Sequence, residues 1–140
     1  MSEAALKLDA AALNAFLAKA FPEAGAHLPE VVEAEPGRVL MRQAFATRAL
    51  RPGGLISGPT QMAMADTAGY ALVLAHIGEV AMAVTTSLTI HFLRGAKPGD
   101  LYAEGALLKL GRRIATADVL IWSESRERAC AKATVAYAIP

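Results

Sequence analysis

Residues 59–77 (PTQMAMADTAGYALVLAHI) form the longest apolar run in the chain and predict one long buried helix. Apolar side chains fall on nearly every side of such a helix, which is typical of a helix that other elements surround. Turn residues bound the run, with Pro52-Gly53-Gly54 before it and Gly78 after it. At ~1.5 Å per residue the helix extends about 30 Å, roughly the diameter of a small domain. We therefore expect this helix at the centre of the fold.

Polar residues inside the run argue against a helix that crosses a membrane. Gln61, Asp66 and His76 all lie within it. An ionised group at the middle of a bilayer costs at least ~2.5 kcal/mol. The run therefore predicts a core helix, and we expect no membrane partner.

Strand-like segments stand on both sides of the predicted helix. Residues 80–93 alternate between apolar and polar side chains. The apolar face would carry Val84, Leu88, Ile90 and Phe92, and the polar face Thr85, Ser87, Thr89 and His91. Turn signals such as Lys97-Pro98-Gly99-Asp100 separate the segments. The predicted strands are 31–34, 38–45, 80–93, 101–110, 114–122 and 129–139.

The order of these segments predicts an α+β fold. Short connections favour antiparallel pairing of successive strands, which gives a sheet of about six strands wrapped round the long helix. A further helix is expected near the N-terminus, where Leu13, Phe16 and Leu17 fit a helical stripe that Pro22 ends. We interpret residues 1–25 as a capping helix and residues 26–140 as the main domain.

Composition narrows the function classes. The chain is 54% hydrophobic and 19% charged, with a formal net charge of +1. This balance excludes a disordered acidic tail and provides no overall field that attracts nucleic acid. The single cysteine, Cys130, allows no internal disulfide and indicates a reducing compartment, the cytoplasm. No histidine lies at a metal-ligand spacing from another, so no metal site is predicted.

Asp66 is the main candidate for chemistry because it lies among apolar residues of the predicted helix, Met62 to Ala65. A carboxylate removed from water there is a stronger general base, and the same position suits a nucleophile that forms an acyl anhydride. The sequence does not separate these two roles. The alternative is a core carboxylate that is hydrogen-bonded to a neighbouring Thr or strand.

Four segments, in this order, carry a family resemblance: residues 57–67, residues 83–100, residues 108–113 and residues 129–137. The first is a small-residue loop, Ser57-Gly58-Pro59, that opens the helix and precedes the acid Asp66. Over about residues 30–140, the chain resembles the phenylacetate-degradation type of acyl-CoA thioesterase in the hotdog superfamily. The resemblance therefore implies a hotdog fold.

The resemblance implies hydrolysis of acyl-CoA thioesters to the free acid and coenzyme A. No cofactor is expected, because coenzyme A enters as part of the substrate. Asp66 would be the general base or nucleophile, and the Gly58 backbone N–H would polarise the thioester carbonyl. A glycine at a helix start suits that role, because its N–H is unpaired and a carbonyl can approach it closely. The Thr85 hydroxyl would help to place the attacking water, with Thr86 nearly equivalent in sequence.

The loop departs from the family pattern at three positions. Ser57 stands where the family usually has His, and Pro59 stands where it has a second Gly. Ser57 fits a helix N-cap and Pro59 the first helical position. Arg51 lies near a position where the family usually has Asn or Gln. Its side chain would bind a carboxylate or phosphate of the substrate, or remain in solvent. These departures put the contribution of the loop to catalysis in question.

A basic cluster marks the turn at Gly111, where Lys109, Arg112 and Arg113 lie close together in sequence. Arginine forks suit phosphate. The resemblance implies that the nucleotide of coenzyme A binds here, together with Arg94. The alternative is a solvated turn.

Two rival functions remain for the same fold. A hotdog dehydratase needs a His paired with an acid, and the loop before the helix has no His. A non-catalytic acyl-CoA-binding or regulatory hotdog module is the stronger alternative. The resemblance also implies a homo-oligomer, a dimer or a dimer of dimers, in which subunits share each site.

Overall fold

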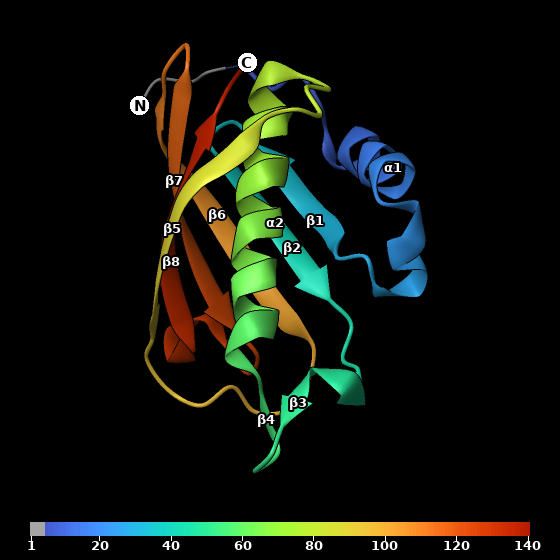
Figure 1. The fold of residues 1–140 in the computed structure, drawn as a ribbon, viewed down its shortest axis with the longest axis vertical. Helices are drawn as coiled ribbons and strands as arrows, with labels where there is room; N and C mark the ends of the chain where they lie inside the picture. The colour runs from blue at the N-terminus through green and yellow to red at the C-terminus, as the bar shows by residue number, and fades with distance from the viewer. Residues whose placement is uncertain (1–4) are drawn as a thin grey trace.

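A six-stranded antiparallel sheet curves round one long helix in the computed structural model, which describes residues 5–140 (Figure 1). The sheet has the order β1-β2-β6-β7-β8-β5, and the central helix is α2, Gly58–Ile77. The strands are β1 Glu30–Glu35, β2 Arg38–Gln43, β5 Val84–Phe92, β6 Leu101–Leu110, β7 Ile114–Trp122 and β8 Ala131–Ala138. Both the expected α+β class and the expected hotdog architecture are confirmed.

The pairing of the strands differs from the expectation that successive strands are neighbours. β5 does not pair with β6; it pairs with β8 at the far edge, while β2 pairs with β6. After α2 the chain forms β5 at one edge of the sheet and then β6 near the middle of the sheet. The sheet therefore curves round α2 with segments from before and after the helix on its two sides. A hairpin that the sequence marked only as a turn, β3 Leu50–Arg51 with β4 Leu55–Ile56, precedes α2.

The ends of α2 follow from local sequence. The Ser57 hydroxyl accepts a hydrogen bond from the Thr60 N–H at 3.2 Å, which makes Ser57 the N-cap as expected. Gly58 takes the first helical position and Pro59 the second, where a missing N–H again costs nothing. At the other end Gly78 has φ +93°, a left-handed conformation that favours glycine.

Buried side chains of α2 face the sheet along most of its length, and Ala65, Ala68, Leu72 and Ala75 are fully buried. His76 is also buried; its Nε2 accepts a hydrogen bond from the Gly37 N–H at 2.9 Å. Gly37 lies in the turn between β1 and β2, so His76 ties the end of α2 to that turn. None of the helices within residues 5–140 combines the length and apolar content needed to cross a membrane.

The N-terminal helix α1, Ala10–Ala20, packs against β1 and contributes Leu13, Phe16 and Leu17 to the core. The Asn14 side chain donates to the Val31 carbonyl and accepts from the Val31 N–H, at 2.9 and 2.8 Å. A short 3-10 helix, η1 Pro22–His27, follows α1. Residues 1–4 of the predicted capping segment lie outside the described residues.

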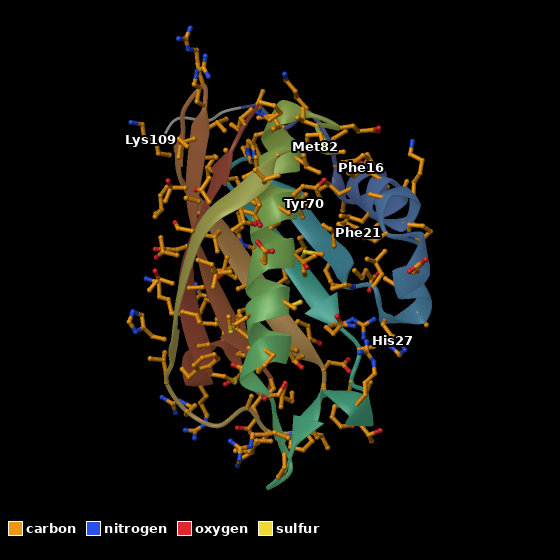
Figure 2. All side chains as sticks on the ribbon, viewed as in Figure 1. Phe16, Phe21, His27, Tyr70, Met82 and Lys109 are labelled. Atoms are coloured by element: carbon orange, nitrogen blue, oxygen red, sulfur yellow. The ribbon has the colours of Figure 1, made fainter. Side chains whose placement is uncertain are left out.

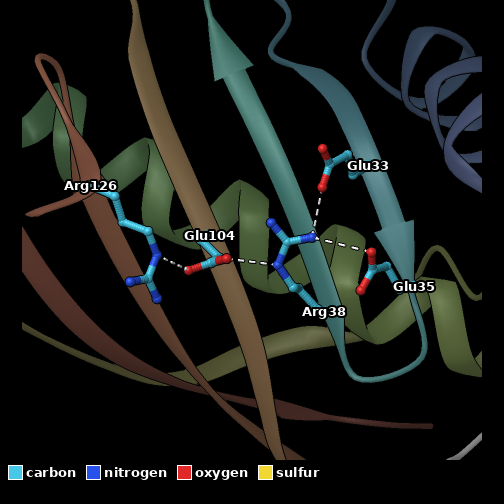
Figure 3. A network of polar contacts seen from close by, with 5 residues as sticks. All are labelled: Glu33, Glu35, Arg38, Glu104 and Arg126. Atoms are coloured by element: carbon cyan, nitrogen blue, oxygen red, sulfur yellow. Dashed lines mark hydrogen bonds and ion pairs between the residues drawn. The ribbon is translucent and has the colours of Figure 1, made fainter.

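The face of the sheet away from α2 carries a chain of ion pairs (Figure 3). Glu104 on β6 accepts hydrogen bonds from Arg38 and Arg126, each at 2.7 Å, and Arg38 also pairs with Glu33. Burial raises the pKa of Glu104, but the two guanidinium hydrogen bonds outweigh it, so the net effect is a pKa below the usual range. Glu104 therefore stays charged in the folded protein.

Candidate functional site

Asp66 projects from the middle of α2 and is held by hydroxyl groups from two strands. The Thr85 hydroxyl, on β5, donates to Asp66 Oδ1 at 2.6 Å. The Tyr137 hydroxyl, on β8, donates to the same oxygen at 2.5 Å and also contacts the Asp66 carbonyl oxygen. Asp66 Oδ2 has no hydrogen-bond partner within residues 5–140. One oxygen of the carboxylate is thus fixed and the other is available.

A β-bulge brings Thr85 to Asp66. The register of β5 against β8 shifts between Thr85 and Ser87, so one extra residue interrupts the alternation of faces. Strict alternation of apolar and polar side chains predicts Thr85 on the outer, polar face of the sheet. The bulge turns the Thr85 side chain toward α2, while Leu88 and Ile90 still pack against the core.

Asp66 borders a hollow of about 330 Å³ instead of lying in the dry environment that the sequence predicted. The carboxylate is half-buried, because the helix face that carries it opens toward this hollow. Phe21 and Tyr70 meet edge to face across it, with ring centroids 6.1 Å apart (Figure 2). Its other lining residues are Thr67, Ala81, Ala83, Val84, Thr85 and Tyr137. The hollow is therefore mainly apolar, with one carboxylate at its wall.

A second hollow, of about 440 Å³, lies at the start of α2. Gly58, Arg51 and Arg94 all line it. The Gly58 N–H has no partner inside the helix, because the first four N–H groups of a helix lack one. Phe92 on β5 lies over Gly58, and a Cβ at Gly58 would be 3.3 Å from its ring.

Gln61 adds a polar group to the second hollow that the sequence analysis did not single out. Its side chain is buried, and its Nε2 donates to the Ile56 carbonyl at 3.3 Å. Its Oε1 has no hydrogen-bond partner among the described residues. A buried acceptor without a donor is costly, and a ligand N–H at this point would satisfy it.

Asp66 and Gly58 do not meet within one chain. They are separated by eight residues of helix, about 12 Å along its axis, and they line different hollows. Thr85 is hydrogen-bonded to Asp66, whereas Arg51 and Arg94 line the same hollow as Gly58. Ser57 and Pro59 lie in the first turn of α2.

Thr86 and the basic cluster lie away from both groups. The Thr86 hydroxyl donates to the Ala136 carbonyl at 3.3 Å, so it faces β8 and not the hollow. Gly111 closes the β6–β7 turn through its N–H, which donates to the Ile114 carbonyl at 2.9 Å. Lys109 lies near the end of the molecule opposite β3 and β4 (Figure 2). Arg112 and Arg113 are exposed in the same turn.

Tyr137 is the functional candidate that the sequence analysis missed. Its place on the last strand is 71 residues from Asp66, and no local pattern connects the two. A weak signal exists in Gly69, a glycine inside a long helix. A Cβ at Gly69 would be 2.9 Å from the Tyr137 ring, so the glycine makes room for that ring.

Residues 53–130 match the model of a family described as the thioesterase superfamily. A solved structure of a proposed thioesterase from a Silicibacter species is similar at 40% identity and a TM-score of 0.90, over 99% of this chain and 96% of that one. No curated protein sequence matches the chain.

Two more distant structures share the fold. A mutant of the phenylacetic acid degradation protein from Thermus thermophilus has 24% identity and a TM-score of 0.73, over 85% of this chain and 99% of that one. A Streptococcus mutans protein bound to acetyl-CoA has 22% identity and a TM-score of 0.70, over 81% of this chain and 89% of that one.

Proposed function

The chain belongs to the thioesterase superfamily, whose common reaction is thioester hydrolysis, and we propose that its substrates are acyl-CoA thioesters. The observation that carries this proposal is the Asp66 carboxylate, which is fixed through one oxygen beside an apolar hollow. The products are a free acid and coenzyme A. The reaction uses no cofactor beyond the coenzyme A of the substrate.

Asp66 supplies the base or the nucleophile. Thr85 and Tyr137 hold Oδ1, so Oδ2 is the oxygen that acts. It takes a proton from a water that attacks the thioester carbonyl, or it attacks that carbonyl itself. The acyl group occupies the apolar part of the hollow, beside the Phe21–Tyr70 ring pair.

The oxyanion donor comes from a second copy of the chain. β5 is an edge strand, and its outer edge has no partner in the sheet. Near its start Thr85 touches Asp66, and at its end Phe92 lies over Gly58. Antiparallel pairing of two β5 strands therefore brings Asp66 of one copy to Gly58 of the other.

Exposed apolar side chains support this pairing. Val84 and Phe92 on β5 are each 50% exposed, and Met82 just before it is 71% exposed. Burial of such side chains is the usual driving force for a dimer interface. The assembly is a homodimer at least, and each of its two sites is shared between copies.

The coenzyme A arm lies along the second hollow. Its amide N–H groups supply the donor that Gln61 Oε1 lacks, and Arg51 and Arg94 are within the same hollow for its phosphates. In an antiparallel pair, the Lys109 end of one copy approaches the Gly58 end of the other. The exposed cations Lys109, Arg112 and Arg113 are then placed for the nucleotide. The single buried Cys130 is consistent with a cytoplasmic enzyme.

The test is thiol release from a panel of aryl- and alkyl-CoA esters by the wild type and Asp66→Asn. Loss of the base lowers kcat by at least about 100-fold while CoA-ester binding persists. Asp118→Asn is the matched control, because Asp118 also accepts from a threonine hydroxyl, Thr134 at 2.8 Å, but on β7. It keeps wild-type activity.

A non-catalytic acyl-CoA-binding module is the other candidate, because Ser57, Pro59 and Arg51 replace residues that the family uses in its loop. Tight binding of CoA esters by the wild type with no thiol release would establish it. Full activity in Asp66→Asn would contradict the proposed role of the carboxylate.

A further inference from the structure

Two tyrosines line the hollow beside Asp66, and only one reaches the carboxylate. The Tyr70 hydroxyl donates to the Ala81 carbonyl at 3.0 Å. The Tyr137 hydroxyl donates to Asp66 Oδ1 at 2.5 Å. Asp66, Tyr70 and Tyr137 are the titratable groups among the described residues that line the hollow.

The fold makes room for Tyr137 at a cost to the helix. Gly69 lies inside α2, where glycine is less favourable than alanine by about 1 kcal/mol. A Cβ at this position would be 2.6 Å from Val135 Cγ2 and 2.9 Å from Tyr137 Cε1. The glycine therefore allows the β8 side chains to lie directly against the helix, with the Tyr137 hydroxyl one turn away at Asp66.

The Tyr137 hydroxyl remains a donor across the working pH range. Burial raises the pKa of Tyr137, and the hydrogen bond to the Asp66 carboxylate raises it further. The ring is 2% exposed, so water does not compete for the proton.

We propose that Tyr137 is a positioning residue for catalysis, which holds the Asp66 carboxylate in one orientation beside the hollow. The inference rests on the proposed function, because it concerns the same carboxylate. Two hydroxyls on Oδ1 fix the side chain from adjacent strands, and Oδ2 accepts no hydrogen bond within residues 5–140.

The experiment compares Tyr137→Phe with the wild type and with Tyr70→Phe. Tyr137→Phe keeps the ring and removes the hydroxyl. Its kcat falls about 10- to 100-fold with a smaller change in KM, as expected for one lost hydrogen bond to a charged group. Tyr70→Phe removes the other tyrosine hydroxyl of the hollow, which does not contact Asp66, so any change that it causes falls on KM more than on kcat.

A double mutant separates positioning from a general structural role. If Tyr137 acts through Asp66, adding Tyr137→Phe to Asp66→Asn causes no further loss of residual activity. An equal loss in both backgrounds would overturn the inference. So would a Tyr137→Phe variant that is less stable in urea but has the wild-type kcat.

A crystal structure of Tyr137→Phe needs no substrate. The Asp66 side chain occupies more than one rotamer in this variant and a single rotamer in the wild type, and an unchanged single rotamer would contradict the inference. Absence of hydrolysis by the wild type would instead overturn the proposed function, while the two crystal structures still decide whether Tyr137 positions Asp66.

Discussion

At the scale of single residues, the site depends on contacts between positions that are far apart in the chain. Asp66 is recognisable as an acid inside an apolar helix. Its two donors come from β5 and β8, and Gly69 is explained only by the Tyr137 ring packed against it. A carboxylate that accepts hydrogen bonds from two hydroxyls is held in one orientation, which is what the proposed hydrolytic role requires.

Gly69→Ala tests this packing. In an unconstrained helix the change stabilises by about 1 kcal/mol, but here the new Cβ would overlap Val135 and Tyr137. We expect net destabilisation of about 1–3 kcal/mol, measured by urea unfolding, together with reduced kcat.

The control is Ala63→Gly on the exposed side of the same helix, which should destabilise by about 1 kcal/mol through helix propensity alone. A Gly69→Ala protein that is more stable than the wild type would show that the ring does not need this space.

At the scale of secondary-structure elements, the two faces of the sheet have different tasks. The inner face packs on α2 and positions Thr85 and Tyr137. The outer face is joined by the Glu104 ion pairs, which connect β1, β2 and β6 with η3, Arg126–Arg128 (Figure 3). On the inner face, the register of β5 against β8 fixes which of their residues reach the helix.

Glu104→Gln should make the free energy of unfolding depend less on pH in the acidic range. The folded protein lowers the pKa of Glu104 below its ordinary value of 4.5, so its contribution is fully present above that pH and is lost as pH falls through the folded value. We expect a loss of about 1–2 kcal/mol at pH 7, measured by urea unfolding, and a smaller difference from the wild type below about pH 4.

Glu127→Gln is the reference variant, because Glu127 is exposed and has no ion pair within residues 5–140. A difference between Glu104→Gln and the wild type that stays constant from pH 7 to pH 3 would exclude a role for its charge.

At the scale of the whole molecule, the proposed site is divided between two points along α2 of one chain. Asp66 and Gly58 are about 12 Å apart along the helix axis, too far to act on one carbonyl. In the dimer that we propose, the exposed edge of β5 joins the halves of two copies. Light scattering should therefore give at least twice the 14.6 kDa mass of the chain.

Mixing two inactive variants tests the shared site. Asp66→Asn lacks the carboxylate, and Gly58→Val puts a branched side chain where the carbonyl must approach. In a refolded mixture, half of the dimers contain one chain of each kind, and each of these has one intact site. We expect about a quarter of wild-type activity to return, measured by thiol release.

The controls are each variant refolded alone, which should remain inactive. If the mixture is no more active than the separate variants, each site is built within one chain and the shared-site proposal is wrong.

The sequence by itself determined the helix and most of the strands, and it predicts Asp66 as the key acid. The long apolar run required a surrounded helix, its capping residues set the ends of that helix, and a carboxylate inside such a run is the basis of the Asp66 prediction. These features depend on neighbours along the chain, where periodicity and turn chemistry act directly.

Only the tertiary structure decided which strand lies beside which and what touches Asp66. The sequence placed Thr85 on the outer face because a bulge is invisible to strict alternation, and it missed Tyr137 because no local pattern connects two strands with a helix. The sequence also predicts that the Asp66 carboxylate is removed from water, because the hollow beside α2 is lined by residues from distant segments of the chain. Such contacts arise from the packing of distant segments, and their register is fixed only when the whole sheet closes on the helix.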